Sequence, residues 1–165
     1  MTYPQLIQAV QSALAPLAAA EGGSVIVAES IEQARSFLDS APNRWRVILH
    51  WEGFGDHDKA REGMTSHQVA TVIQAPRGLD HSPDITRPQL DGTPGFSARI
   101  AAIVGWMGAM RFPNGTGADV AGFAMAGSQW LATVPNFAAH VINWKLDAAL
   151  PPYEKTIPLV FPHLA

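Results

Sequence analysis

Two long segments of the sequence carry no charged side chain, and this restricts the folds open to the chain. Neither residues 1–20 nor residues 120–144 contain Asp, Glu, Lys or Arg. Charged residues make up 15% of the chain, against about 25% in an average soluble domain. Both segments are interrupted by polar residues and proline, and no run of about 18 apolar residues occurs. We therefore expect a soluble protein with no membrane partner and a surface poor in charge.

Length and composition exclude several classes of protein. The chain has 165 residues, which matches one domain of about 100–200 residues. A net charge of −3 excludes the strongly basic surface of a typical nucleic-acid-binding protein. The absence of cysteine excludes thiolate catalysis and Cys-ligated zinc. No charged residue precedes Glu21, so we expect no signal peptide, which would begin with a basic region.

The first third of the sequence predicts a helix, a strand and a second helix. Residues 4–20 have apolar side chains at helical spacing, and Pro16 is expected to kink or shorten the last turn. Glycines 22 and 23 end this helix, and residues 24–28 predict a strand. Ser30 and Gln33 resemble a capping box, which predicts a short helix over residues 31–38. The apolar stripe of the first helix consists of Leu6, Ile7, Val10, Leu14 and Leu17.

The remaining sequence predicts two hairpins with a helix between them. Residues 45–52 alternate between apolar and polar side chains, which predicts a half-buried strand, and residues 67–75 predict its hairpin partner. Residues 96–110 predict a helix capped by Ser97 or Thr93, and the glycine-rich residues 112–122 predict a turn region. The second hairpin is expected over residues 123–133 and 137–146. The inner face of the first strand would consist of Trp45, Val47, Leu49 and Trp51.

This order of elements predicts an α+β fold. We expect an antiparallel or mixed sheet of about four to five strands, flanked by two main helices. The domain would span residues 1–150. Residues 151–165 would form an extended, proline-rich C-terminal arm.

Residues that can bind metals occur in two connecting segments. Asp56, His57 and Asp58 could bind a cation together with His67, or with Asp80, His81 and Asp84, since carboxylate oxygen and imidazole nitrogen are common ligands. Their spacing matches no zinc or calcium motif, and a solvated turn explains them as well. We therefore assign no metal and no other cofactor.

No catalytic motif stands out. Ser128 lacks the second glycine of a nucleophile elbow, and His140 is expected on a strand face beside Ile142 and Trp144. His50 and Glu52 share one strand face, as such pairs do in many sheets. The glycine-rich residues 114–117 have no lysine for phosphate binding. The five tryptophans are expected mainly in the core, with one or two at an interface. We expect no enzyme.

The order of elements, with two particular segments, carries a family resemblance. Arg46-Val47-Ile48-Leu49 enters the central hairpin, and Trp130-Leu131-Ala132 followed by residues 140–150 forms a closing hairpin. Over residues 2–150 the sequence resembles the tail terminator, or tail-completion, proteins of long-tailed bacteriophages. The resemblance implies a non-enzymatic virion protein, assembled in the host cytoplasm, that forms a ring, usually a hexamer. Such a ring caps the head-proximal end of the tail tube, ends tube polymerisation and contacts the head–tail connector protein, and DNA can pass through its lumen.

A ring subunit buries both of its sides, and three segments suit such contacts. The outer side of the first helix is uncharged, the tip of the first hairpin has mixed charges, and the C-terminal arm is apolar. The sheet would continue from subunit to subunit through its edge strands. The predicted interface residues are Gln5, Gln8, Ser12, Asp56, Asp58, Lys59, Arg61, Glu62, Ile157, Leu159 and Phe161.

Two alternatives remain open at the level of the sequence. One is another neck or head–tail connector component, which has the same size and uncharged character; a terminator gene should lie close to the tail tube gene. The other is a small metal-dependent hydrolase that uses Asp56, His57, Asp58, His67 and His81. Bound metal in the purified protein, lost on replacing His57 and His67, would favour the hydrolase.

Overall fold

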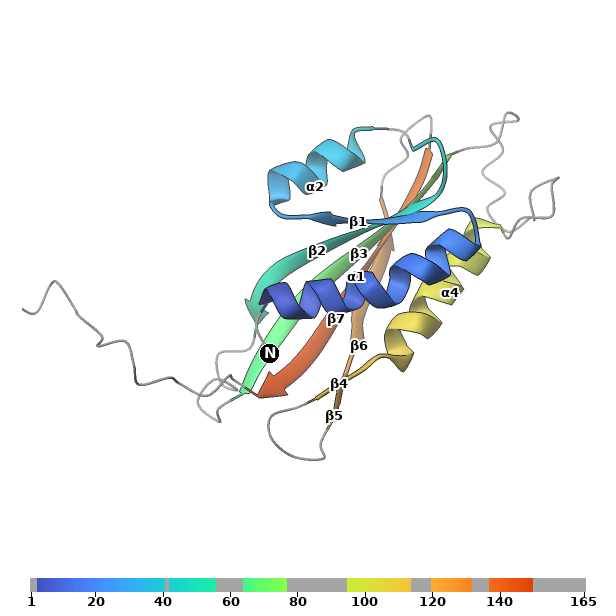
Figure 1. The fold of residues 1–165 in the computed structure, drawn as a ribbon. Coiled ribbons are helices and arrows are strands. Elements are labelled where there is room, and N and C mark those ends of the chain that lie inside the picture. Colours follow the sequence, from blue (N-terminus) through green and yellow to red (C-terminus); the bar gives the residue numbers. More distant parts are fainter. Residues whose placement is uncertain are drawn as a thin grey trace, which may run out of the picture.

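The computed structural model describes residues 3–40, 42–55, 64–76, 95–113, 120–131 and 137–149. Within these ranges the chain forms three helices and seven strands (Figure 1). The helices are α1 (Tyr3–Ala20), α2 (Ile31–Leu38) and α4 (Phe96–Ala109). The strands are β1 (Ser24–Ala28), β2 (Arg46–Gly55), β3 (Met64–Pro76), β4 (Arg111–Pro113), β5 (Val120–Gly122), β6 (Ala124–Trp130) and β7 (Phe137–Ala149).

Five of the strands form one mixed sheet in the order β1-β2-β3-β7-β6. β1 runs parallel to β2, and α2 lies in the connection between them. The other three pairs, β2–β3, β3–β7 and β7–β6, are antiparallel. Both predicted hairpins are therefore present, as β2–β3 and β6–β7. Together with the helices, the sheet confirms the α+β fold.

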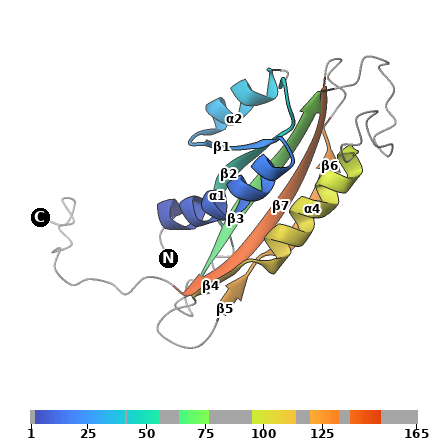
Figure 2. The same cartoon turned by 45° about the vertical axis from the view of Figure 1, so that its right-hand side comes forward.

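The sheet carries a hydrophobic core on each face. The larger core joins α1 and α4 to side chains of the strands such as Leu49 and Ile142, and both helices lie on the same face (Figure 2). The smaller core lies beneath α2 and includes Ala34, Ile48 and Val72. The prediction that only one side of residues 45–52 is buried is wrong at Ile48, which is fully buried, because α2 covers that side of β2.

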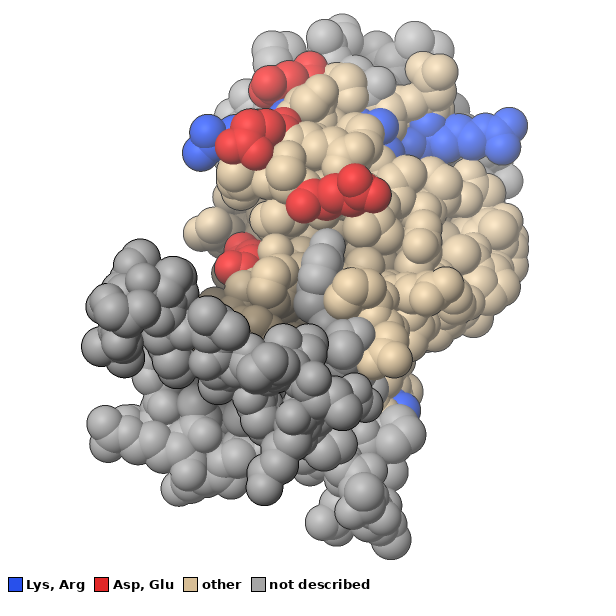
Figure 3. Space-filling model, turned by 60° about the vertical axis from the view of Figure 1, so that its left-hand side comes forward, with Lys and Arg blue, Asp and Glu red and all other residues tan. Residues whose placement is uncertain are grey.

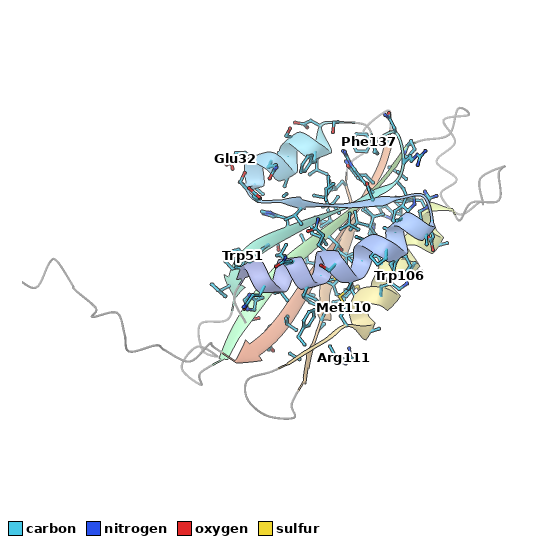
Figure 4. The ribbon with its side chains drawn as sticks, viewed as in Figure 1. Glu32, Trp51, Trp106, Met110, Arg111 and Phe137 are labelled. Atoms are coloured by element: carbon cyan, nitrogen blue, oxygen red, sulfur yellow. The ribbon has the colours of Figure 1, made fainter. Side chains whose placement is uncertain are left out.

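The partly buried side chains show where the larger core ends. Trp51, Trp106 and Met110 pack against this core from its border, around α1 and α4 (Figure 4). Phe137 instead belongs to the core beneath α2. The two long helices thus cover one face together, rather than one face each.

Helix α1 ends in a Schellman motif. The Gly23 N–H donates to the Ala18 carbonyl at 2.8 Å, and the Gly22 N–H donates to the Ala19 carbonyl at 3.0 Å. Gly22 has a φ of 73°, a conformation that glycine adopts without steric cost. The predicted end of the helix at these glycines is confirmed. Pro16 does not shorten the helix, since it lies exposed within α1, where a carbonyl left without an N–H donor can bind water.

Helix α2 is fixed at both ends. The Ser30 hydroxyl accepts a hydrogen bond from the Gln33 N–H at 3.1 Å, so the predicted N-cap is confirmed. The Gln33 side chain accepts from the Glu29 N–H at 2.7 Å rather than from Ser30. At the other end, Arg46 Nη2 donates to the Phe37 carbonyl at 2.7 Å and to the Ser40 carbonyl at 2.9 Å. The sheet thereby satisfies carbonyl groups that the helix leaves unpaired.

Two local predictions in the second half are wrong. Helix α4 has Gly95 as its N-cap with no side-chain hydrogen bond, and Ser97 lies inside the helix; Thr93 lies outside the described residues. The expected turn region also contains parts of a small antiparallel sheet, in which Phe112 pairs with Ala121. Phe112 packs edge-to-face on Phe123, with ring centroids 5.5 Å apart. Burial of these rings in the larger core holds the short strands together.

Candidate subunit interface

Helix α1 presents an uncharged outer side. The predicted interface residues Gln5, Gln8 and Ser12 are all exposed on it, and the whole helix holds no Asp, Glu, Lys or Arg. Leu17, predicted in the apolar stripe, is 39% exposed, and Ala18 is buried in its place. The outer side of α1 is therefore both uncharged and partly apolar.

Helix α4 extends the uncharged surface, which the sequence did not predict. Its exposed residues are Ala98, Ala101, Gly105 and Ala109. Its one charged residue, Arg99, is 4% exposed, and its guanidinium carbon lies 5.1 Å from the centroid of the Trp45 ring. The signal was present in the sequence, because residues 96–109 have hardly any polar side chain on any side of the helix.

Most exposed charged side chains of the described residues lie on or next to α2, while Arg111 lies exposed just after the end of α4. Glu32 and Arg35 lie exposed on α2, and Glu29 and Asp39 flank it. In Figure 3 the red and blue side chains are few and separated, and most of the described surface in that view is tan. The helical layer formed by α1 and α4 therefore differs in charge from the opposite, α2-covered part of the molecule.

The edge strand β6 presents large apolar side chains. Met125 and Trp130 are 55% and 48% exposed. The Trp130 ring stands edge-on to His140, with centroids 4.8 Å apart, and lies 5.5 Å from the Phe96 ring. Of the five tryptophans, Trp45 and Trp144 are buried in the core, as expected. Trp130 is the one that lies at an edge.

The other predicted interface residues cannot be placed. Asp56, Asp58, Lys59, Arg61, Glu62, Ile157, Leu159 and Phe161 lie outside the described residues. So do His57, Asp80, His81 and Asp84 of the metal hypothesis. The structure thus brings together three of the predicted interface residues, all on α1.

Titratable groups form no reactive arrangement within the described ranges, where no group of three His, Cys, Asp or Glu residues could hold a metal ion. His67 is fully buried, and neither ring nitrogen has a hydrogen-bond partner there. Burial lowers the pKa of His67 and of His140. His140 Nδ1 has no hydrogen-bond partner, so no hydrogen bond links this atom to the hydroxyl of Ser128, which lies opposite Ile142.

His50 and Glu52, which the sequence places on one strand face, have separate surroundings in the structure. His50 Nδ1 lies 3.2 Å from the Ala28 carbonyl, across the β1–β2 pair. Glu52 is exposed near the register shift between Trp51 and Gly53. No hydrogen bond between the two side chains is found, and the His50 ring lies against the neighbouring strand, as in many ordinary sheets.

The described helices include none that is long and apolar enough to cross a membrane. Comparison of the sequence with protein families and with curated proteins finds no match.

Proposed function

We propose that this chain is a structural subunit of a phage tail terminator, which forms a closed ring on the head-proximal end of the tail tube. In that role the ring ends tube polymerisation and offers a surface to the head–tail connector. The order of elements resembles this family over residues 2–150. The observation that carries the proposal is the uncharged layer of α1 and α4.

A layer of this kind favours contact with protein rather than with water. The exposed residues of α1 include Gln8, Ser12 and Leu17, and those of α4 are alanine and glycine. The centres of protein interfaces are depleted in charged residues, and removing water from uncharged side chains costs far less free energy than removing it from ionised ones. A helix on the surface of a monomer usually has charged residues on its solvated side. Both long helices of this chain depart from that pattern.

The same surface argues for a binding role rather than a catalytic one. A nucleophile needs a base within hydrogen-bond reach, and a metal needs converging ligands. The described residues bring neither together, while they present an extended uncharged surface on two helices. We therefore assign the uncharged surface of α1 and α4 to assembly contacts between neighbouring copies and with the tube.

Electron microscopy of the purified chain, alone and mixed with tail tubes of the phage that encodes it, tests the proposal. We expect rings of uniform diameter in the first sample and one ring at one end of each tube in the second. Tube protein polymerising in the presence of the chain should stop growing at the capped end. A chain that stays monomeric at high concentration and leaves tube ends bare would contradict the proposal.

A further inference from the structure

The main sheet has two open edges. β1 pairs only with β2 and β6 pairs only with β7, so these strands end the sheet on its two sides. A strand paired on one side directs the N–H and C=O groups of alternate residues outward. Within the described residues no strand pairs with these outer sides. Each edge is therefore able to accept a further strand.

Neither edge has the charges or prolines that usually prevent such pairing. β6 reads AMAGSQW and β1 reads SVIVA. Six of the seven residues of β6 are exposed. A register shift between Met125 and Gly127 interrupts its pairing with β7, so the regular part of β6 is Gly127–Trp130. A pairing of four or five residues matches the five residues of β1.

Trp130 is positioned to anchor a strand at this edge. Contacts with His140 and Phe96 hold its ring from two sides, while 48% of the residue stays exposed. Tryptophan, like tyrosine and arginine, is enriched among the residues that dominate binding energy at interfaces. Because directly paired residues share one face of a sheet, Met125 lies on the same face as Trp144, the side of α4. The edge thus offers both backbone hydrogen-bonding groups and an apolar contact.

We propose that β6 of one copy pairs with β1 of the next copy, so that the sheet continues from subunit to subunit. Both edges lack charge, so neither strand has to bury an ionised group. Pairing β6 with a second β6 would satisfy one edge and leave β1 open, whereas β6–β1 contact satisfies both. The C-terminal residues 150–165 are a poorer occupant, since four prolines interrupt their row of N–H donors.

The direction of the pairing follows from the sheet itself. β6 runs opposite to β1 within one sheet, and rotation about an axis along the strands preserves strand direction. The new pair is therefore antiparallel. The contact joins different surfaces of two identical chains, and such contacts close into a ring when the rotation closes. This inference rests on the proposed ring and names the contact that builds it.

Disulfide crosslinking tests the contact cleanly, because the natural chain has no cysteine. Gln129 and Ser24 are exposed, and both lie on the α2 side of the sheet, since they pair with Val141 and Arg46. Gln129→Cys is combined in turn with Ser24→Cys, Ile26→Cys and Ala28→Cys. These three positions cover the strand registers in which Gln129 of one copy lies opposite a β1 residue on the α2 side of the sheet. On oxidation we expect at least one double variant to form a ladder from dimer up to the full ring. Gln129→Cys alone should stay uncrosslinked.

A disulfide dimer from Gln129→Cys alone would overturn the inference in favour of β6–β6 pairing. Rings that form normally while all three double variants stay uncrosslinked would also overturn it, although the ring itself would stand. A chain that forms no assembly would contradict the proposed function instead.

As a second measurement, Ser128→Lys places a charge on the edge and should weaken association at least tenfold. The same change at Ser36, exposed on α2, should leave association unchanged, and equal association of both variants would overturn the inference.

Discussion

The indole N–H of Trp144 donates a hydrogen bond to the hydroxyl oxygen of Thr71 at 2.9 Å, in the buried interior of the sheet. The hydroxyl of Thr71 in turn donates to the Ile142 carbonyl at 3.4 Å. This chain of two hydrogen bonds links β3 to β7, the longest strand pair of the fold. It lets the largest fully buried side chain, Trp144, enter the core without leaving its N–H unpaired.

Replacing Thr71 by valine should therefore destabilise the fold. The change keeps the shape but leaves the Trp144 N–H buried without a partner, which costs about 1–3 kcal/mol. Urea unfolding followed by tryptophan fluorescence measures the loss. Thr71→Ser keeps the hydroxyl and should lose less stability. Equal losses of unfolding free energy in the two variants would show that this hydrogen bond does not contribute to stability.

Replacing either glycine at the end of α1 by alanine should destabilise the fold, for a different reason at each position. A Cβ on Gly23 would overlap the Trp45 ring, and overpacking of this kind costs about 1–3 kcal/mol. A Cβ on Gly22 meets nothing within 4 Å, but φ is +73° there, so the cost of Gly22→Ala lies in the backbone.

Double-mutant cycles with Trp45→Phe separate the two causes. The smaller ring should relieve part of the overlap, so the costs of Gly23→Ala and Trp45→Phe should add to more than the cost of the double variant. The coupling between Gly22→Ala and Trp45→Phe should be smaller, because no atom of the ring lies within 4 Å of a Cβ at residue 22, and the only link is the hydrogen bond from the Trp45 indole to the neighbouring Glu21 carbonyl. Additivity in both cycles, from urea unfolding, would show that the ring does not restrict residue 23.

The buried His67 should make stability fall in mild acid. Burial lowers the pKa of its ring, so below about pH 6.5 the unfolded chain binds a proton that the folded chain does not. The contribution is fully present above that pH and is lost as pH falls toward the folded-state pKa. Between pH 7.5 and pH 5.5, the loss of unfolding free energy should be smaller for His67→Leu than for the natural chain. Thr71→Val has no titrating group and should keep the natural pH dependence; a His67→Leu variant that keeps it too would contradict the assignment.

Much of the fold followed from local patterns. The short helix α2 begins where Ser30 and Gln33 placed it, and α1 ends at Gly22 and Gly23, because caps and glycine turns act through neighbouring residues. Burial was harder to predict. After Leu14, both the third and the fourth following residue continue a helical stripe, and packing selected Ala18 over Leu17. Ile48 was assigned to solvent because the position of α2 over the sheet depends on distant contacts.

The candidate interface was predicted only in part. The uncharged side of α1 could be read from the sequence, since one helical pattern defines both of its sides. The uncharged surface of α4 was missed, although the near absence of polar side chains in residues 96–109 indicates it; the structure places the single charged residue of the helix, Arg99, against the Trp45 ring. One or two tryptophans were expected at an interface, but the sequence did not indicate that Trp130 is one of them, since a tryptophan in a strand usually packs in the core. Only the strand order, with β6 at the edge, reveals it.

A charge placed on α1 should disrupt assembly without unfolding the chain. Ser12 and Ser36 are both exposed helix residues, so Ser12→Glu and Ser36→Glu make the same chemical change on α1 and α2. Ser12→Glu should weaken association roughly tenfold or more, because about 1.4 kcal/mol of desolvation cost is enough for that factor. Ser36→Glu should associate like the natural chain. Equal association of the two variants, measured by sedimentation velocity, would remove α1 from the interface.

The mass of the natural chain in solution tests the central claim most directly. Light scattering coupled to size-exclusion chromatography should give one closed oligomer, with a mass that is an integral multiple of 17.7 kDa and stays constant over a tenfold range of concentration. An open association would instead give a mass that rises with concentration. A single species of 17.7 kDa at high concentration would contradict the ring.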